Sequence, residues 1–310
     1  MLQFIVRRFL SLIPTMFIIV TLGFVIIRAA PGGPFTTEVN VPEVILQQLM
    51  DKFHLNESIP RQYLRFLGDL IFRGDLGPSM VSRDFNVSEQ ISLALPVSAT
   101  LGLTALTLAL LMGVTTGLIA ALKQNSIIDY SAMSLAIMWI SVPLFVIGPI
   151  FILVFALNLG WFPSQGWIDS RAGLMALVLP AVTLALPSFG SFARITRTGV
   201  IETLRSDYVR TARAKGLSEF TILTKHVLKG ALLPVVTILG PMVAGLVTGS
   251  VVIETTFNVP GLGGLLIRST FNRDYTLMMG GIITYSMILI TMNFIVDIVY
   301  GFIDPRISYK

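Results

Sequence analysis

The chain has 310 residues, of which 54% are hydrophobic and only 13% are charged, and its mean hydropathy is +0.81. A soluble globular protein carries about 25% charged residues, so the composition indicates an integral membrane protein. The absence of cysteine, together with only two histidines, excludes disulfides, thiolate metal sites and a histidine metal cluster. The net charge of +5 does not indicate nucleic-acid binding, because many of the basic residues lie in one short segment between apolar stretches.

Six apolar stretches are long enough to cross a bilayer as helices, which takes about 20 residues each. The expected spans are 9–27, 95–122, 131–157, 173–193, 231–253 and 276–303. The first stretch follows Arg7 and Arg8 as in a signal peptide, but Phe9–Ile27 has 19 residues, more than the roughly 7–15 of a signal-peptide core. We therefore expect a retained first helix and one all-α membrane domain over 1–310.

Residues 31–92 form an insertion after the first span, predicted to lie outside the cell. Pro42 is placed to begin a helix with one apolar face, and a second amphipathic stretch follows Pro60 and ends at Gly74-Asp75. The apolar positions of these two helices are Leu46, Leu49, Met50 and Phe53, then Tyr63, Leu67, Leu70 and Ile71. Two interpretations stay open, a passive cap on the membrane surface and a docking surface for an external partner.

The fifth span contains Gly240, Pro241, Gly245 and Gly249, and the last two form a G-x-x-x-G pattern. Such spacing lets helix backbones approach closely, and proline loosens a helix. We expect these residues to pack helices or to line a pathway, at the contact with a second subunit. Asp297 is the one charge expected inside a span, and pairing near the headgroups is favoured over an ion relay.

Residues 194–230 carry eight basic residues in one short loop, which places this loop and both chain termini in the cytoplasm by the positive-inside rule. The pattern predicts helix, sharp turn, helix, with Gly216 ending the first helix. The small residues Ala212, Ala214 and Gly216 predict a flat surface for another protein. Basic residues are expected to flank that surface at Arg205, Arg210, Arg213 and Lys215.

Motifs for nucleotide binding and catalysis are absent from the sequence. There is no G-x-x-x-x-G-K-[ST] loop, and the glycine cluster 261–264 lacks the lysine of such a loop and is predicted to lie outside. There is also no H-E-x-x-H and no G-x-S-x-G. We therefore expect no catalytic residues, no cofactor and no metal site in this chain.

The stretch Tyr208–Leu217, YVRTARAKGL, resembles the cytoplasmic loop motif of ABC importer permeases in its peptide-transporter form. Further stretches are similar to the same family, so that the resemblance covers the whole chain: Arg7-Arg8, 74–79, 120–125, 254–263 and 303–306. Within the family the pattern is nearest to oligopeptide permeases. Two positions depart from the general importer motif, with Arg210 in place of the usual glutamate and Lys229 in place of the usual proline.

The resemblance implies a type I permease fold and a multi-pass protein of the bacterial inner membrane. It also implies a homologous second permease, two ATP-binding cassette subunits that hold ATP and Mg, and an external peptide-binding protein. ATPase coupling is then assigned to Arg205, Tyr208, Arg210, Thr211, Ala212, Arg213, Ala214, Lys215, Gly216 and Leu217.

The sequence alone leaves alternatives open for the transported substrate and for the class of membrane protein. Dipeptide, glutathione and nickel permeases share much of this pattern. An ion-coupled secondary transporter is disfavoured because Asp297 is the only charge expected in a span, and a membrane-embedded enzyme is disfavoured by the missing catalytic motifs.

Overall fold

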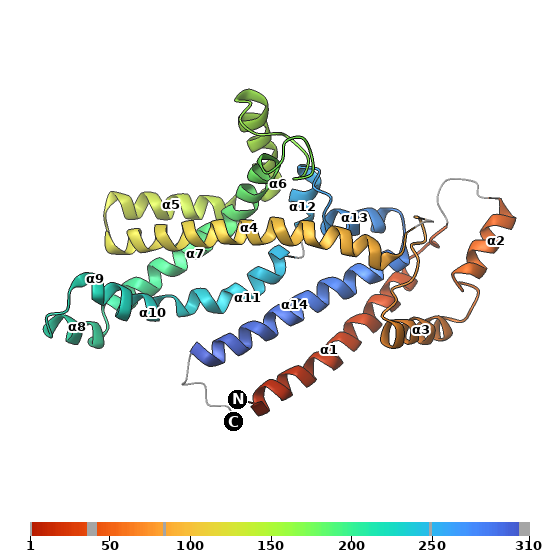
Figure 1. The fold of residues 1–310 in the computed structure, drawn as a ribbon, viewed down its shortest axis with the longest axis horizontal. Helices are drawn as coiled ribbons and strands as arrows, with labels where there is room; N and C mark the ends of the chain where they lie inside the picture. The colour runs from red at the N-terminus through yellow and green to blue at the C-terminus, as the bar shows by residue number, and fades with distance from the viewer. Residues whose placement is uncertain (1, 36–41, 83–84, 248–249, 304–310) are drawn as a thin grey trace.

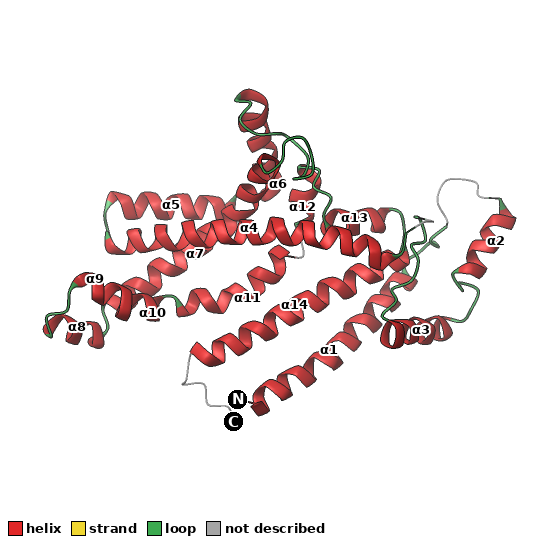
Figure 2. Ribbon diagram, viewed as in Figure 1, coloured by secondary structure: helices red, strands yellow, loops and turns green. Residues whose placement is uncertain are grey.

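The computed structural model describes residues 2–35, 42–82, 85–247 and 250–303, and within these residues the regular structure is entirely helical (Figures 1 and 2). Five helices are long and apolar enough to cross a membrane, or six if one bent pair is counted as a span. The expected all-α fold is confirmed, and the six expected spans are matched if the bent pair is counted as one span.

Helices α1 (Leu2–Ala29) and α14 (Tyr275–Ile303) lie side by side (Figure 1). Part of their contact is an apolar cluster, in which Val20 and Phe24 of α1 pack with Met279 and Ile283 of α14. The first and last apolar stretches of the sequence therefore pair in space, and α14 begins within one residue of its expected start.

Helices α4 (Val87–Leu122) and α7 (Met175–Leu204) form the most extensive helix contact, and α11 (Leu233–Val247) packs on α4. Glycine allows the close approach, since a Cβ placed on Gly113 lies 2.6 Å from the Cβ of Phe192 and one on Gly117 lies 2.4 Å from the carbonyl of Ala193. The G-x-x-x-G pattern in the second span is therefore a helix-packing device within this chain.

The expected span 131–157 is not one helix. α5 (Ile127–Ser141) and the pair α6 (Leu144–Phe151) and η2 (Ile152–Asn158) are bent by 104° at the break between them. Val142 and Pro143 have extended backbone there, because the ring of a proline disfavours the helical conformation of the residue before it. In Figure 1, α6 projects away from the layer that contains α4 and α5.

Short helices lie at the two ends of the bundle. The insertion contains α2 (Glu43–Lys52), α3 (Ile59–Gly68) and η1 (Asp69–Arg73), and α12 (Val251–Thr256) and α13 (Leu262–Phe271) precede α14. The segment after α7 contains α8 (Asp207–Ala214), α9 (Glu219–Thr221), η3 (Ile222–Val227) and α10 (Leu228–Ala231). Figure 1 shows α8 and α3 at opposite ends of the molecule.

Two helices extend beyond the apolar stretches that predicted them. Residues 87–92 of the expected insertion begin α4, and residues 194–204 of the expected cytoplasmic segment continue α7. Both extensions contain polar residues and continue each helix beyond its apolar part. Hydropathy alone therefore does not predict that these residues are helical. Both amphipathic helices of the insertion are present as expected, with Pro42 preceding α2 and Pro60 in the first turn of α3.

Candidate functional site

The segment from Arg205 to Leu217, here called the coupling segment, forms a tight turn and a short helix at one end of the bundle. α7 ends at Leu204, Ser206 takes an extended conformation, and α8 begins at Asp207. Asp207 in the first turn and Arg213 in the last turn suit the helix dipole. The predicted helix, turn and helix are therefore present. The end of α7 leads into the segment.

The inner face of α8 is buried in the chain itself. Val209 and Ala212 pack with Val200 of α7 and with Ile222 and Val227 of η3. The expectation that Ala212 forms part of a flat surface for another protein is wrong, because its 5% exposure leaves nothing for a partner to contact. Ala214 and Gly216, by contrast, are exposed.

Gly216 ends α8 as predicted, with a left-handed backbone at φ +77°. Its N–H donates to the carbonyl of Arg213, and the Leu217 N–H donates to the carbonyl of Ala212 at 3.3 Å. Arg213 also donates two hydrogen bonds to the Glu219 carboxylate, at 2.8 and 3.1 Å. The turn is therefore closed by a bidentate ion pair. Its hydrogen bonds hold the pKa of Glu219 below its ordinary value and raise the pKa of Arg213.

The outer face of the coupling segment combines positive charge with apolar side chains. Tyr208 and Leu217 are 50% and 40% exposed, and Phe220 of α9 is 78% exposed. The remaining predicted coupling residues with exposed side chains are Arg205, Arg210, Thr211, Arg213 and Lys215. Exposed aromatic and arginine side chains together are typical of protein interfaces. Phe220 was absent from the sequence prediction, although it lies only two residues after the Ser218 cap of α9.

The glycine and proline residues of α11 do not share one role. A Cβ placed on Gly240 lies 2.7 Å from Val296, so Gly240 packs against α14 of the same chain and not against a second subunit. A Cβ placed on Gly245 meets no atom of the described residues within 4 Å, and Pro241 is exposed. Gly249 lies outside the described residues.

A buried carboxylate near the opposite end was missed by the sequence analysis. Glu254 of α12 is 1% exposed and lies inside an apolar stretch, Leu233–Thr256, that is long enough to cross a membrane. Its carboxylate accepts hydrogen bonds from Ser98 Oγ of α4 at 2.6 Å and from the Gly264 N–H at 2.9 Å. Asp297 is therefore not the only acid in a span.

The glycine cluster 261–264 has a structural role around this carboxylate. A Cβ on Gly261 lies 2.4 Å from Glu254, and one on Gly263 lies 3.0 Å from it. The Leu262 N–H donates to Ser98 Oγ at 2.8 Å, which ties the start of α13 to α4. The cluster therefore encloses a carboxylate of its own chain at a helix N-terminus, where negative charge is favourable.

Two further acids form ion pairs between helices. Asp297 of α14 accepts a hydrogen bond from Arg8 Nε of α1 at 2.6 Å, which agrees with the favoured interpretation of a pairing residue. Asp129 of α5 is fully buried and binds Arg197 of α7 through two bonds of 2.5 and 2.7 Å. This second pair was also missed, because both residues were assigned to loops.

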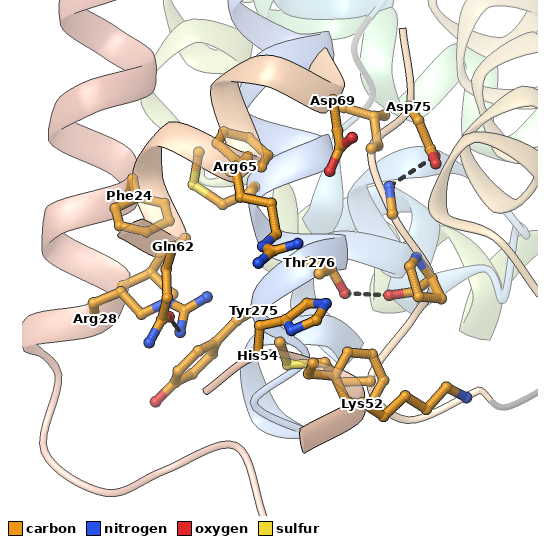
Figure 3. Close-up of a pocket in the computed structure, with 18 residues that line it drawn as sticks. Phe24, Arg28, Lys52, His54, Gln62, Arg65, Asp69, Asp75, Tyr275 and Thr276 are labelled. Carbon is orange, nitrogen blue, oxygen red and sulfur yellow. Dashed lines mark hydrogen bonds between the residues drawn. The ribbon is translucent and has the colours of Figure 1, made fainter. Parts of the chain in front are cut away.

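The insertion packs on α1 and α14, and a cavity of about 140 Å³ lies between them (Figure 3). Arg28 hydrogen-bonds Gln62 and lies over the rings of Phe24 and Tyr275, at 5.1 and 5.5 Å from their centroids. Figure 3 shows His54 and Arg65 reaching into the same cavity from the insertion. The insertion is thus a packed part of the fold.

A larger cavity of about 830 Å³ lies at the same end of the bundle, between α4, α13 and the loop before α7. Its wall includes Phe85 and Trp167, Gln90 at the start of α4, and the charged residues Asp169 and Arg268. A volume in the range of about 300–1,000 Å³ is typical of sites for small ligands. None of its charged residues was among the predicted site residues.

Comparison with known proteins gives matches along nearly the whole chain. Residues 113–309 match the family "Binding-protein-dependent transport system inner membrane component", and residues 1–84 match the corresponding N-terminal family. The chain is 45% identical over 309 residues to "Oligopeptide transport system permease protein OppB" of Escherichia coli and 44% identical to OppB of Haemophilus influenzae, with 100% of each chain covered. It is 41% identical over 308 residues to "Dipeptide transport system permease protein DppB" of Bacillus subtilis, covering 99% of this chain and 98% of that protein.

Solved structures show the same fold. The MetNI methionine ABC transporter in an inward-facing conformation gives a TM-score of 0.58 at 15% identity, covering 69% of this chain and 96% of that chain. An amino acid ABC transporter with histidines gives 0.55 at 17% identity, covering 69% and 94%. The expectations of a type I ABC permease fold and of a transport component that is not an enzyme are confirmed. The chain is a multi-pass protein of the bacterial inner membrane and belongs to the family of inner membrane components of binding-protein-dependent transport systems.

Proposed function

We propose that the chain is the membrane-spanning subunit of an ATP-driven importer that moves oligopeptides into the cell. The observation that carries this proposal is the two-faced helix α8. Its inner face is fixed in the chain by Val209 and Ala212, while Tyr208, Leu217 and Phe220 remain exposed beside basic residues. A partner bound to that outer face moves the helix bundle through the buried inner face.

The partner on α8 is an ATP-binding cassette subunit, and two such subunits hold ATP and Mg. This chain lacks a phosphate-binding loop of its own, which is consistent with ATP hydrolysis on partner chains. A homologous second permease completes the pathway, and an external protein delivers the cargo. ATP binding moves the pathway only if the ATPase contacts differ between the two permease conformations.

The orientation follows from charge. The eight basic residues within 194–230 support an orientation with α8 and both chain termini in the cytoplasm. α3, α13 and the two cavities then lie outside, and the insertion is available to the binding protein or to the outer mouth of the pathway.

Oligopeptides are the favoured cargo because of the full-length similarity to OppB proteins. The similarity to a dipeptide permease keeps dipeptides as the second candidate. Glutathione and nickel remain alternatives from the sequence pattern alone.

Co-purification tests the ATPase contact. Phe220→Ser removes an aromatic side chain that is 78% exposed at the cytoplasmic end, and Phe271→Ser removes one that is 81% exposed at the opposite end. In membranes containing the whole transport system, we expect Phe220→Ser to lower the ratio of ATPase subunit to tagged permease, and Phe271→Ser to leave it unchanged. Equal ratios for both variants contradict the assignment of α8 and α9 as the docking site.

The proposed oligopeptide cargo is tested by identifying the ligand of the external binding protein. Mass spectrometry of the ligand released from the co-purified binding protein is expected to find peptides of three or more residues. A single ligand of two residues, glutathione or nickel ions identifies one of the alternatives and overturns the oligopeptide assignment.

A further inference from the structure

The 830 Å³ cavity between α4, α13 and the loop before α7 is lined by side chains of opposite charge. Among the described residues that line it, Asp169 is the only acid and Arg268 the only base. Both side chains are exposed, and they form no salt bridge with each other or with another described residue. The carboxylate of Asp169 is therefore available to a cation that enters the cavity.

Arg268 is less available to a ligand than Asp169. Arg268 lies one helical turn after Gly264 in α13, and the Gly264 N–H binds the buried Glu254 carboxylate. A peptide carboxylate at Arg268 competes with that internal acid, whereas an ammonium group at Asp169 has no competing partner among the described residues.

Gln90 supplies a second unused polar group. Its Nε2 atom is buried and has no hydrogen-bond partner among the described residues, although Gln90 lines the cavity. A buried donor without an acceptor costs free energy. Turning the Gln90 side chain toward the cavity lets a ligand carbonyl oxygen accept this hydrogen bond, which removes the cost.

Phe85 and Trp167 add aromatic surface to the same wall. A ligand that suits this lining combines a cation, a carbonyl acceptor and an apolar side chain. The first residue of a peptide carries all three groups within one extended unit.

We infer that this cavity binds the amino-terminal end of a peptide cargo, with Asp169 accepting the α-ammonium group and the Gln90 amide donating to a main-chain carbonyl. The inference depends on the proposed function, since it assumes that peptides reach the outer mouth of this permease. It identifies a contact in the membrane subunit itself, in addition to selection by the external protein.

Photo-crosslinking in the complete importer tests the site. The importer with its binding protein is reconstituted in vesicles and supplied with a pentapeptide that has a benzophenone on its first or its last residue. We expect the first-residue probe to label segments 85–100, 167–169 or 260–268, and the last-residue probe to label them much less. Equal labelling by both probes overturns the inference.

Variants separate a charge contact from a structural role. Loss of a hydrogen bond to a charged group corresponds to about a tenfold weaker interaction. We expect Asp169→Asn to lower first-residue crosslinking about tenfold and to raise the half-saturating peptide concentration for uptake, with peptide affinity of the binding protein unchanged. Asp169→Glu is expected to restore both, and Gln90→Leu to weaken both.

Glu89→Gln is the matched control, because Glu89 is an exposed acid beside Gln90 that does not line the cavity. If Asp169→Asn behaves like Glu89→Gln, the site is wrong while peptide import stands. If wild-type vesicles with ATP take up no peptide at all, the proposed function fails instead, so the two failures are distinguishable.

Discussion

At the scale of single residues, Gly216 ends α8 in a left-handed backbone conformation. The φ of +77° is accessible to glycine and costs other residues about 1 kcal/mol. A Cβ at this position meets no atom of the described residues within 4 Å, so the space around it is open and the strain is limited to the backbone.

Gly216→Glu is expected to leave the chain inserted and folded but to weaken ATPase binding. The added carboxylate lies among the exposed basic side chains and projects toward the partner. We expect lower peptide-stimulated ATP turnover and less co-purified ATPase in reconstituted vesicles, with Gly216→Ala as the mild control. Full stimulated turnover with normal subunit ratios in Gly216→Glu shows that this turn has no coupling role.

Asp129 and Arg197 join α5 to α7 near the coupling segment. Because Asp129 is buried and Arg197 is 25% exposed, removing one charge leaves the other poorly solvated. We expect Asp129→Asn to destabilise the folded protein by about 3 kcal/mol, the lower part of the range for breaking a buried pair. The measurement is the thermal unfolding midpoint in detergent.

Arg197→Lys is the comparison for this pair, since it keeps the charge and loses the two parallel bonds. Its loss of stability is expected to be smaller than that of Asp129→Asn. An unchanged midpoint in Asp129→Asn is incompatible with a structural role for the pair.

At the scale of elements, two glycines of α11 have different surroundings. A Cβ placed on Gly240 contacts Val296 of α14, whereas a Cβ placed on Gly245 meets no atom of the described residues within 4 Å. The contact with a second permease that the sequence predicts for this helix is therefore tested at Gly245.

Leucine substitutions distinguish the two glycines. Gly240→Leu is expected to clash with α14 and to reduce the yield of monodisperse permease. Gly245→Leu is expected to keep the yield and to reduce co-purification of the second permease and peptide uptake. Normal assembly and uptake in Gly245→Leu show that this position contacts lipid.

At the scale of the whole molecule, the orientation is testable because the chain contains no cysteine. Phe72 of η1 is 87% exposed, and Lys225 of η3 is exposed. η1 directly follows α3 and η3 directly follows α9, and Figure 1 shows α3 and α9 at opposite ends of the molecule. In spheroplasts, an impermeant maleimide is expected to label Phe72→Cys directly and Lys225→Cys only after permeabilisation. Labelling of both variants from outside rejects the proposed topology.

The sequence by itself determined the membrane class, the approximate spans, the two helices of the insertion and the turn at Gly216. These features depend on local properties, namely apolar run length, helical periodicity, and proline or glycine at a helix end. The stretch that resembles the cytoplasmic loop motif of importer permeases is contiguous in the sequence. The position of segment 205–217 could therefore be predicted without knowledge of any tertiary contact.

Only the tertiary structure decided which neighbour each side chain meets. Pro143 accounts locally for the break after α5, but the 104° angle accompanies the packing of α6 on α7 and α12. The burial of Ala212 depends on η3, which follows it in the chain. Glu254 and Ser98 are separated by 156 positions, and hydropathy gives no sign that a carboxylate at the end of one apolar stretch meets a hydroxyl group in another. A buried charge is tolerated only with such partners, and long-range packing alone supplies them.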